Sequence, residues 1–90
     1  MTQVTLHILA EDIKTTSYLN GNDCAITKAL HRAGHPELQH SGLFIIKDKE
    51  DSFDVVCNDD EHRTFTKKVQ DMYNGRTEIK DFSATLNLNL

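Results

Sequence analysis

The residues best suited to chemistry form a polar loop and the helix that it enters. The loop offers an aromatic ring that can stack on a base, and a helix start offers free backbone amides to a phosphate. Two basic side chains four positions apart share one face of the helix and can neutralise the phosphate charge. We therefore expect a site for a nucleotide-like ligand, although an ordinary loop before a helix has the same composition. The candidate residues are Tyr18, Asn20, Gly21 and Asn22 in the loop, and Lys28 and Arg32 on the helix.

The two cysteines are a second set of candidates. Cys24 lies near the start of the same expected helix, where the positive end of the dipole favours a reactive thiolate. A small side chain packed under the preceding loop is the alternative and the simpler interpretation. Cys57 follows an apolar stretch and is expected in the core.

Histidines are frequent, and three of them, His31, His35 and His40, lie close along the chain. Zinc needs three or four ligands that converge in tetrahedral geometry. Gly34 and Pro36 interrupt the helix that would align the first two of these histidines. We therefore expect solvated histidines and no metal site.

The segment 48–61 is rich in carboxylates. Clustered carboxylates can bind a divalent cation or present an acidic surface to a basic protein. The segment lacks glycine and the spacing of a calcium-binding EF-hand loop, so a solvated loop followed by a helix cap is the alternative.

Composition narrows the classes of partner. The chain has 90 residues, enough for one domain, and its formal net charge of -4 argues against duplex DNA or an anionic membrane surface. No apolar run approaches the roughly 20 residues of a membrane helix, and no signal-peptide pattern is present, so we expect a cytoplasmic protein with reduced thiols. The sequence has no nucleophile-base pair, glycine-rich phosphate loop or paired-acid motif, and we expect neither an enzyme nor a cofactor.

The elements that must position these residues start with two amphipathic strands at the ends of the chain. Apolar and polar residues alternate over 82–90 and again over 2–9, which predicts strands with one dry and one wet face. Two such strands are natural neighbours in an antiparallel sheet that is covered on one side. The apolar runs 43–46 and 53–56 predict two further strands, covered on both faces, with a polar hairpin turn between them.

Two helices complete the pattern. The first is expected to begin at Asn22 or Asp23 and to end at Gly34, with a core stripe of Ile26, Ala29, Leu30 and Ala33. The second is expected to begin at Asp59 or Asp60 and to end at Asn74-Gly75, with Phe65, Val69, Met72 and Tyr73 on its buried face. A short turn is expected near residues 10–14.

The resulting order is strand, helix, strand, strand, helix, strand. It predicts a single α+β domain over residues 1–90, with a four-stranded antiparallel sheet and two helices on one face, in the β-α-β-β-α-β arrangement of ferredoxin-like domains. The last strand would be an edge without proline or charge, and pairing through it, or through the open face of the sheet, would make a homo-oligomer.

Four segments resemble small uncharacterised proteins encoded in phage and prophage genomes. They are Ala10 to Ile13 after the first strand, Asp23 to Leu30 opening a helix, Met72 to Gly75 ending the second helix, and Phe82 to Leu86 in the last strand. The family typically has Cys-Pro-Ile-Ala-x-Ala-Leu at the helix start and Pro-Phe-x-Phe-x-Leu at the final strand. This chain has Ala25 and Asp81 where those motifs have proline.

The resemblance implies a non-enzymatic phage accessory protein that acts against host defence. We expect it to sequester a nucleotide-derived host immune signal in a pocket shared between subunits. The alternative is an acidic inhibitor that uses segment 48–61 to bind and mask a host defence protein.

Overall fold

The computed structural model describes residues 1–16, 24–42 and 44–90. In chain order the described elements are β1 (Thr2–Ile8), α1 (Ala10–Thr15), α2 (Ala25–Arg32), β2 (Leu38–Ser41), β3 (Phe44–Asp48), β4 (Phe53–Cys57), α3 (Asp60–Tyr73) and β5 (Phe82–Leu88). No described helix has the length and apolar character needed to cross a membrane.

The two terminal strands pair as predicted. β1 and β5 form an antiparallel ribbon in which Val4 lies opposite Leu86 and His7 lies opposite Ser83. Alternate side chains point into the core, as the twofold pattern requires, and the opposite face is wet. β5 is shorter than the predicted strand over 82–90, however, because it ends at Leu88 and leaves Leu90 52% exposed.

The middle of the chain forms a separate sheet in the order β2-β3-β4. The turn between β3 and β4 is the predicted polar hairpin, closed by a 2.8 Å bond from the Lys49 amide to the Ser52 carbonyl. Our prediction that β4 is covered on both faces is wrong. It lies at the edge of its sheet, and Phe53 and Val55 are exposed.

The caps of α3 confirm the predicted helix. The Asp59 carboxylate accepts a 2.9 Å bond from the His62 amide at the start, and Gly75, with φ +73°, follows the last turn. In α2 the described helix begins one residue after Cys24, whose sulfur accepts a bond from the Thr27 amide. Ala33 lies outside the buried stripe that we predicted for it, because it is the exposed C-cap residue.

Tyr73 at the end of α3 connects all three helices. Its hydroxyl oxygen accepts a 3.2 Å bond from the Ala25 amide at the start of α2 and bonds to the hydroxyl of Thr16, which follows α1. The first amide of α1 donates a 2.7 Å bond to the carboxylate of Asp81, so that residue holds α1 beside the start of β5.

The predicted ferredoxin-like sheet is wrong. The described residues form five strands in two sheets, of two and three strands, with three helices. The additional strand β2 pairs with β3, and the expected turn at residues 10–14 is the helix α1. A backbone bond of 2.8 Å joins the end of the first sheet to the second, from the amide of Asn89, just after β5, to the carbonyl of Val56 on β4.

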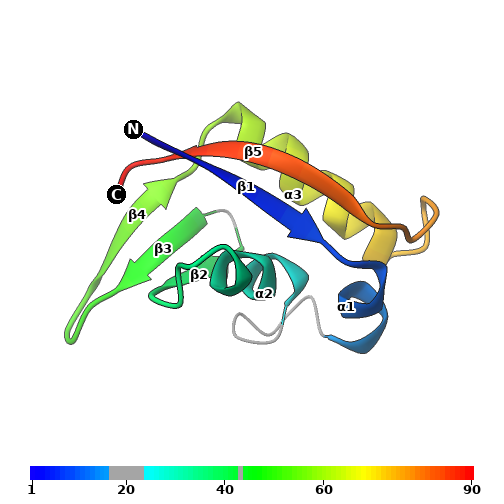
Figure 1. Ribbon diagram of the computed structural model, residues 1–90, viewed down its shortest axis with the longest axis horizontal. Helices are drawn as coiled ribbons and strands as arrows, with labels where there is room; N and C mark the ends of the chain where they lie inside the picture. The colour runs from blue at the N-terminus through cyan, green and yellow to red at the C-terminus, as the bar shows by residue number, and fades with distance from the viewer. Residues whose placement is uncertain (17–23, 43) are drawn as a thin grey trace.

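Beyond that bond, β4 and β5 diverge. Figure 1 shows β4 running in the opposite direction to β5, approaching it near the C-terminus and leading into α3, which then lies along β5. After β4 the chain continues into α3, so within the described residues no strand pairs with β5 on the side away from β1.

Candidate functional site

The structure describes only part of the predicted nucleotide site. Tyr18, Asn20, Gly21 and Asn22 lie outside the described residues. Arg32 lies at the end of α2, where its guanidinium bonds to the Asp12 carboxylate at 2.7 Å and to the His7 carbonyl at 2.8 Å. Lys28 lies one turn earlier and is half-buried. Arg32 thus joins α2 to α1 and β1, and its charge is matched by a carboxylate.

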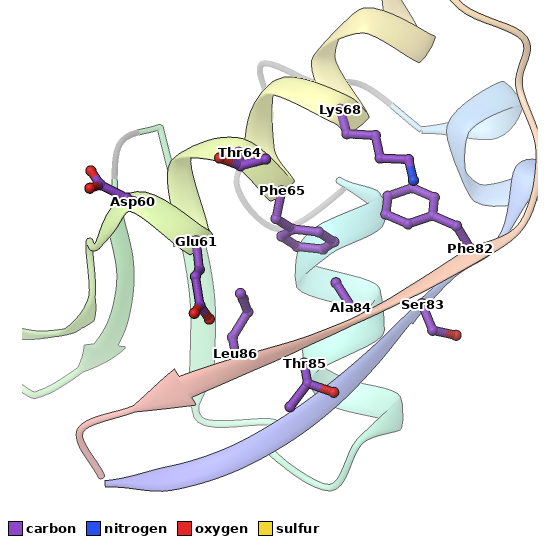
Figure 2. A pocket seen from close by; sticks show the side chains of 10 residues that line it. All are labelled: Asp60, Glu61, Thr64, Phe65, Lys68, Phe82, Ser83, Ala84, Thr85 and Leu86. Carbon is purple, nitrogen blue, oxygen red and sulfur yellow. The ribbon is translucent and has the colours of Figure 1, made fainter.

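A solvent-exposed groove lies elsewhere, between α3 and β5. It has a volume of about 440 Å³ and is open to solvent. Figure 2 shows α3 on one side and β5 on the other, with β1 beyond β5. The lining residues are Asp60, Glu61, Thr64, Phe65 and Lys68 from α3, and Phe82, Ser83, Ala84, Thr85 and Leu86 from β5.

Two aromatic rings make the apolar part of this groove. The rings of Phe65 and Phe82 meet edge to face, with centroids 5.8 Å apart and an interplanar angle of 64°. Phe65 is buried, whereas Phe82 keeps part of its ring exposed. The Lys68 ammonium lies 4.3 Å from the centroid of the Phe82 ring, a cation-π contact at one end of the groove.

The opposite end of the groove is acidic. Asp60 forms an exposed ion pair with Arg63 at the start of α3. The Glu61 side chain points toward Leu86 across the groove (Figure 2). The groove therefore has an acidic end beside Leu86 and a basic end beside Phe82.

The outer edge of β5, the edge away from β1, borders the groove. The positions whose backbone groups point toward this edge can be deduced. In an antiparallel pair, a residue directs its amide and carbonyl either both toward the partner strand or both away from it. The His7 carbonyl bonds to Arg32 and so points away from β5, which makes His7 and its partner Ser83 a non-hydrogen-bonded pair. The amide and carbonyl of Ser83 must then point away from β1, toward the groove.

Two further observations give the same register. Non-hydrogen-bonded pairs bring their side chains close, and short contacts join His7 Nδ1 to Ser83 Oγ (2.7 Å) and Thr5 Oγ1 to Thr85 Oγ1 (3.0 Å). Asn89, which has the same parity as Ser83 and Thr85, directs its amide outward to Val56 on β4. Within residues 1–16, 24–42 and 44–90, no group bonds to the outward backbone of Ser83 or Thr85.

A second polar feature is buried in the core. His40 on β2 and His62 on α3 are 3% and 0% exposed, with ring centroids 5.5 Å apart. His62 Nε2 lies 3.2 Å from the Thr66 hydroxyl, but His40 Nε2 and His62 Nδ1 have no hydrogen-bond partner in the described part of the chain. Our prediction of solvated histidines is therefore wrong for His40.

Burial controls the titration of these groups. It lowers the pKa of His40 to about 4, and the neighbouring His62 adds to the effect. Burial also lowers the pKa of His62, against the opposing effect of Asp59. The described histidines, cysteines and carboxylates include no group of three or more that could hold a metal ion.

Both cysteines are buried, as the simpler interpretation of each predicted. Burial raises the pKa of the Cys57 thiol, and the negative charge of Asp59 raises it further, against the lowering effect of the Asp59 backbone. The Cys24 sulfur is used to cap α2. Neither thiol lines the groove between α3 and β5.

Sequence reasoning missed this groove although it identified parts of it. Phe65 and Phe82 were predicted as core positions from their periodicity, and both do contact the core. The hollow between them depends on the angle between α3 and β5, which leaves no local signal in the sequence. The free edge of β5 was the one available signal, and it was interpreted as an interface with a second copy.

No family model matches this chain, and no curated protein or solved structure matches it either. The resemblance to small phage proteins therefore stays a prediction.

Proposed function

We propose that this chain is a non-catalytic protein-binding domain that accepts an extended segment of a partner protein. The segment adds as a strand to the outer edge of β5 and places an apolar side chain in the groove below α3. Strand addition to an exposed sheet edge is a common mode of peptide recognition, in which main-chain bonds supply affinity and pockets for alternate side chains supply specificity.

The proposal is supported most directly by the position of the unpaired edge of β5, which lies beside the groove. The outward amides and carbonyls of Ser83 and Thr85 border a hollow lined by Phe65 and Phe82. Its volume of about 440 Å³ lies within the roughly 300 to 1,000 Å³ of typical binding pockets. A lone backbone edge or a lone apolar hollow would each be weaker support.

The proposal is closer to the alternative in our sequence prediction than to its leading form. That alternative was an acidic inhibitor of a host defence protein, and Asp60 and Glu61 of its acidic segment line the groove. Sequestration of a nucleotide-derived signal stays a prediction, since its loop residues lie outside the described part. A homo-oligomer also stays a prediction.

The direct test uses a short neutral peptide, acetyl-Thr-Gln-Thr-Leu-Thr-Gln-Thr-amide, titrated into the labelled protein and followed by NMR. Threonine favours extended conformations, and the central leucine is the apolar probe for the groove. We expect chemical-shift changes at residues 82–86 and along the groove-facing side of α3. Slowed exchange of the Ser83 and Thr85 amides would show that the new bonds form at the backbone.

A proline scan makes this test specific. Thr85→Pro removes an amide that points outward, so it leaves the β1–β5 ladder intact but removes a bond to the peptide. Thr85→Ala keeps that amide and is the matched control. We expect Thr85→Pro to lose at least about tenfold in affinity and Thr85→Ala to lose less than twofold. Ser83→Pro, which has the same register, replaces Thr85→Pro if that variant unfolds.

Two outcomes contradict the proposal. One is binding of the peptide with shift changes confined to other surfaces, or with equal affinity for the proline and alanine variants. The other is a stable dimer, seen by sedimentation, whose β5 edges pair with each other and exclude the peptide.

A further inference from the structure

We infer that the bound segment runs antiparallel to β5 and carries a basic residue, an apolar residue and an acidic residue at alternate positions, in that order from its N-terminus. This inference rests on the proposed strand addition and specifies the partner's chemistry. Three features of the groove lead to it.

The direction follows from the fork between β4 and β5. β4 runs opposite to β5 and reaches its outer edge at the bond between Val56 and Asn89, after which the chain turns away into α3 (Figure 1). A strand added further along the same edge occupies the position that β4 would take if it continued. The antiparallel orientation also repeats that of β1 on the other edge of β5, and it gives the more stable hydrogen-bond geometry.

The charge order follows from the two ends of the groove. A segment antiparallel to β5 enters beside Leu86, where Glu61 points into the groove, and leaves beside Phe82, where Lys68 lies over the ring. Asp60 is paired with Arg63, so Glu61 is the carboxylate available to an incoming cation. A basic residue near the N-terminal end and an acidic residue near the C-terminal end match this polarity.

The spacing follows from the lengths of helix and strand. Seven positions separate Glu61 from Lys68, which is about 10.5 Å along a helix. Four positions along a strand span about 13.6 Å and return to the same face. A basic and an acidic side chain placed four positions apart can therefore lean inward and reach Glu61 and Lys68. The residue midway between them faces the same side, toward Phe65 and Phe82, and is the apolar one.

The other face of the segment continues an existing polar ladder. Thr5 and Thr85 bond through their hydroxyls, as do His7 and Ser83, on the wet face of the ribbon. Threonine or serine at the remaining alternate positions extends this ladder by cross-strand bonds.

The experiment compares two blocked peptides of identical composition. The first is acetyl-Thr-Lys-Thr-Leu-Thr-Glu-Thr-amide, and the second exchanges its lysine and glutamate. We expect the first peptide to bind about five- to tenfold more tightly at low salt, and the difference to shrink at 0.5 M salt. In the double variant Glu61→Lys, Lys68→Glu we expect the preference between the two peptides to reverse.

A version of the first peptide in which a spin label replaces the N-terminal acetyl group tests the direction. We expect it to broaden the Leu86 amide signal more than that of Phe82. Equal affinities for the two peptides, or a preference that the double variant leaves unchanged, would overturn the inference. In that case binding of the neutral peptide with its proline sensitivity would still stand, so the two proposals fail separately.

Discussion

The pair formed by His40 and His62 is a polar defect in an otherwise apolar core. Each ring has one nitrogen without a partner in the described part of the chain, and both are held neutral by burial. A buried neutral histidine opposes folding when the pH is low enough to protonate it in the unfolded chain. These residues therefore link stability to pH.

The first prediction is that stability falls between pH 6.5 and about 4. The unfolded His40 takes up a proton near pH 6.5, whereas the folded one resists until about pH 4. The free energy of unfolding is thus highest above the unfolded pKa and decreases as the pH falls. His40 accounts for on the order of 3 kcal/mol of this decrease. His62 contributes in the same direction, moderated by Asp59, which raises its pKa, while Arg63 lowers it.

Urea unfolding at pH 7.5, 5.5 and 4.5 measures this effect. The variant His40→Leu fills a similar space without a titratable group, and we expect a shallower pH dependence in it. An equally steep decrease in His40→Leu would assign the effect to other groups.

At the scale of elements, α2 and α3 end in the same way. In each, the glycine amide bonds to the carbonyl three residues back, and the next amide bonds to the carbonyl five residues back. The glycines, Gly34 with φ +96° and Gly75 with φ +73°, adopt the left-handed conformation that this motif needs. An added Cβ would meet no atom within 4 Å at either position.

The second prediction separates backbone strain from crowding. Because space is available, Gly75→Ala should cost about 1 kcal/mol through the left-handed backbone alone. Asn tolerates this conformation better, so Gly75→Asn should cost less. The neighbouring Asn74→Ala, at φ −87°, is the control and should change the free energy of unfolding by less than about 0.5 kcal/mol. Equal costs for all three variants would argue against the backbone explanation.

Elements with strong local signals were predictable from the sequence. α3 was predicted from cap to cap because Asp59, the spacing of Phe65, Val69 and Met72, and Asn74-Gly75 all point to one helix. β1 and β5 were predicted because their alternation is nearly uninterrupted. β2 was missed because it has four residues, of which Leu38 alone is aliphatic and His40 counts as polar although it is buried.

The division into two sheets was not predictable from such signals. It depends on which strands meet over long distances along the chain, and the alternation of β5 continues to Leu90 as if the ladder did too. In the structure Asn89 turns its amide to Val56, and Leu90 remains exposed. The groove arises from the same divergence, and so it was not predicted.

At the scale of the whole molecule, β5 supplies the core with residues from the far end of the chain. Leu86 and Leu88 are 1% and 0% exposed and belong to one cluster with residues of β1, α1, α2, β2, β3, β4 and α3. A domain of this size has a free energy of unfolding of roughly 5 to 13 kcal/mol. Loss of one such side chain is thus a large fraction of the total.

The third prediction uses the contrast between Leu88 and Leu90. Leu88→Ala should cost about 2 to 5 kcal/mol because it opens a cavity in the core. Leu90→Ala should cost less than about 1 kcal/mol, since that side chain is half-exposed. Chemical denaturation of both variants measures the difference, and similar costs would contradict the packing of β5 described above.

The bond between Asn89 and Val56 also limits where an added strand could lie along β5. Any strand that pairs with the outer edge of β5 meets this closed end of the fork and cannot slide past it toward the C-terminus. Under the proposed strand addition, the outward positions left to the segment run from Asn87 back to Ser83, so this bond would limit the registers that the segment can take. Partners would then differ in affinity according to the number of residues between their apolar residue and the end of the segment that meets this bond.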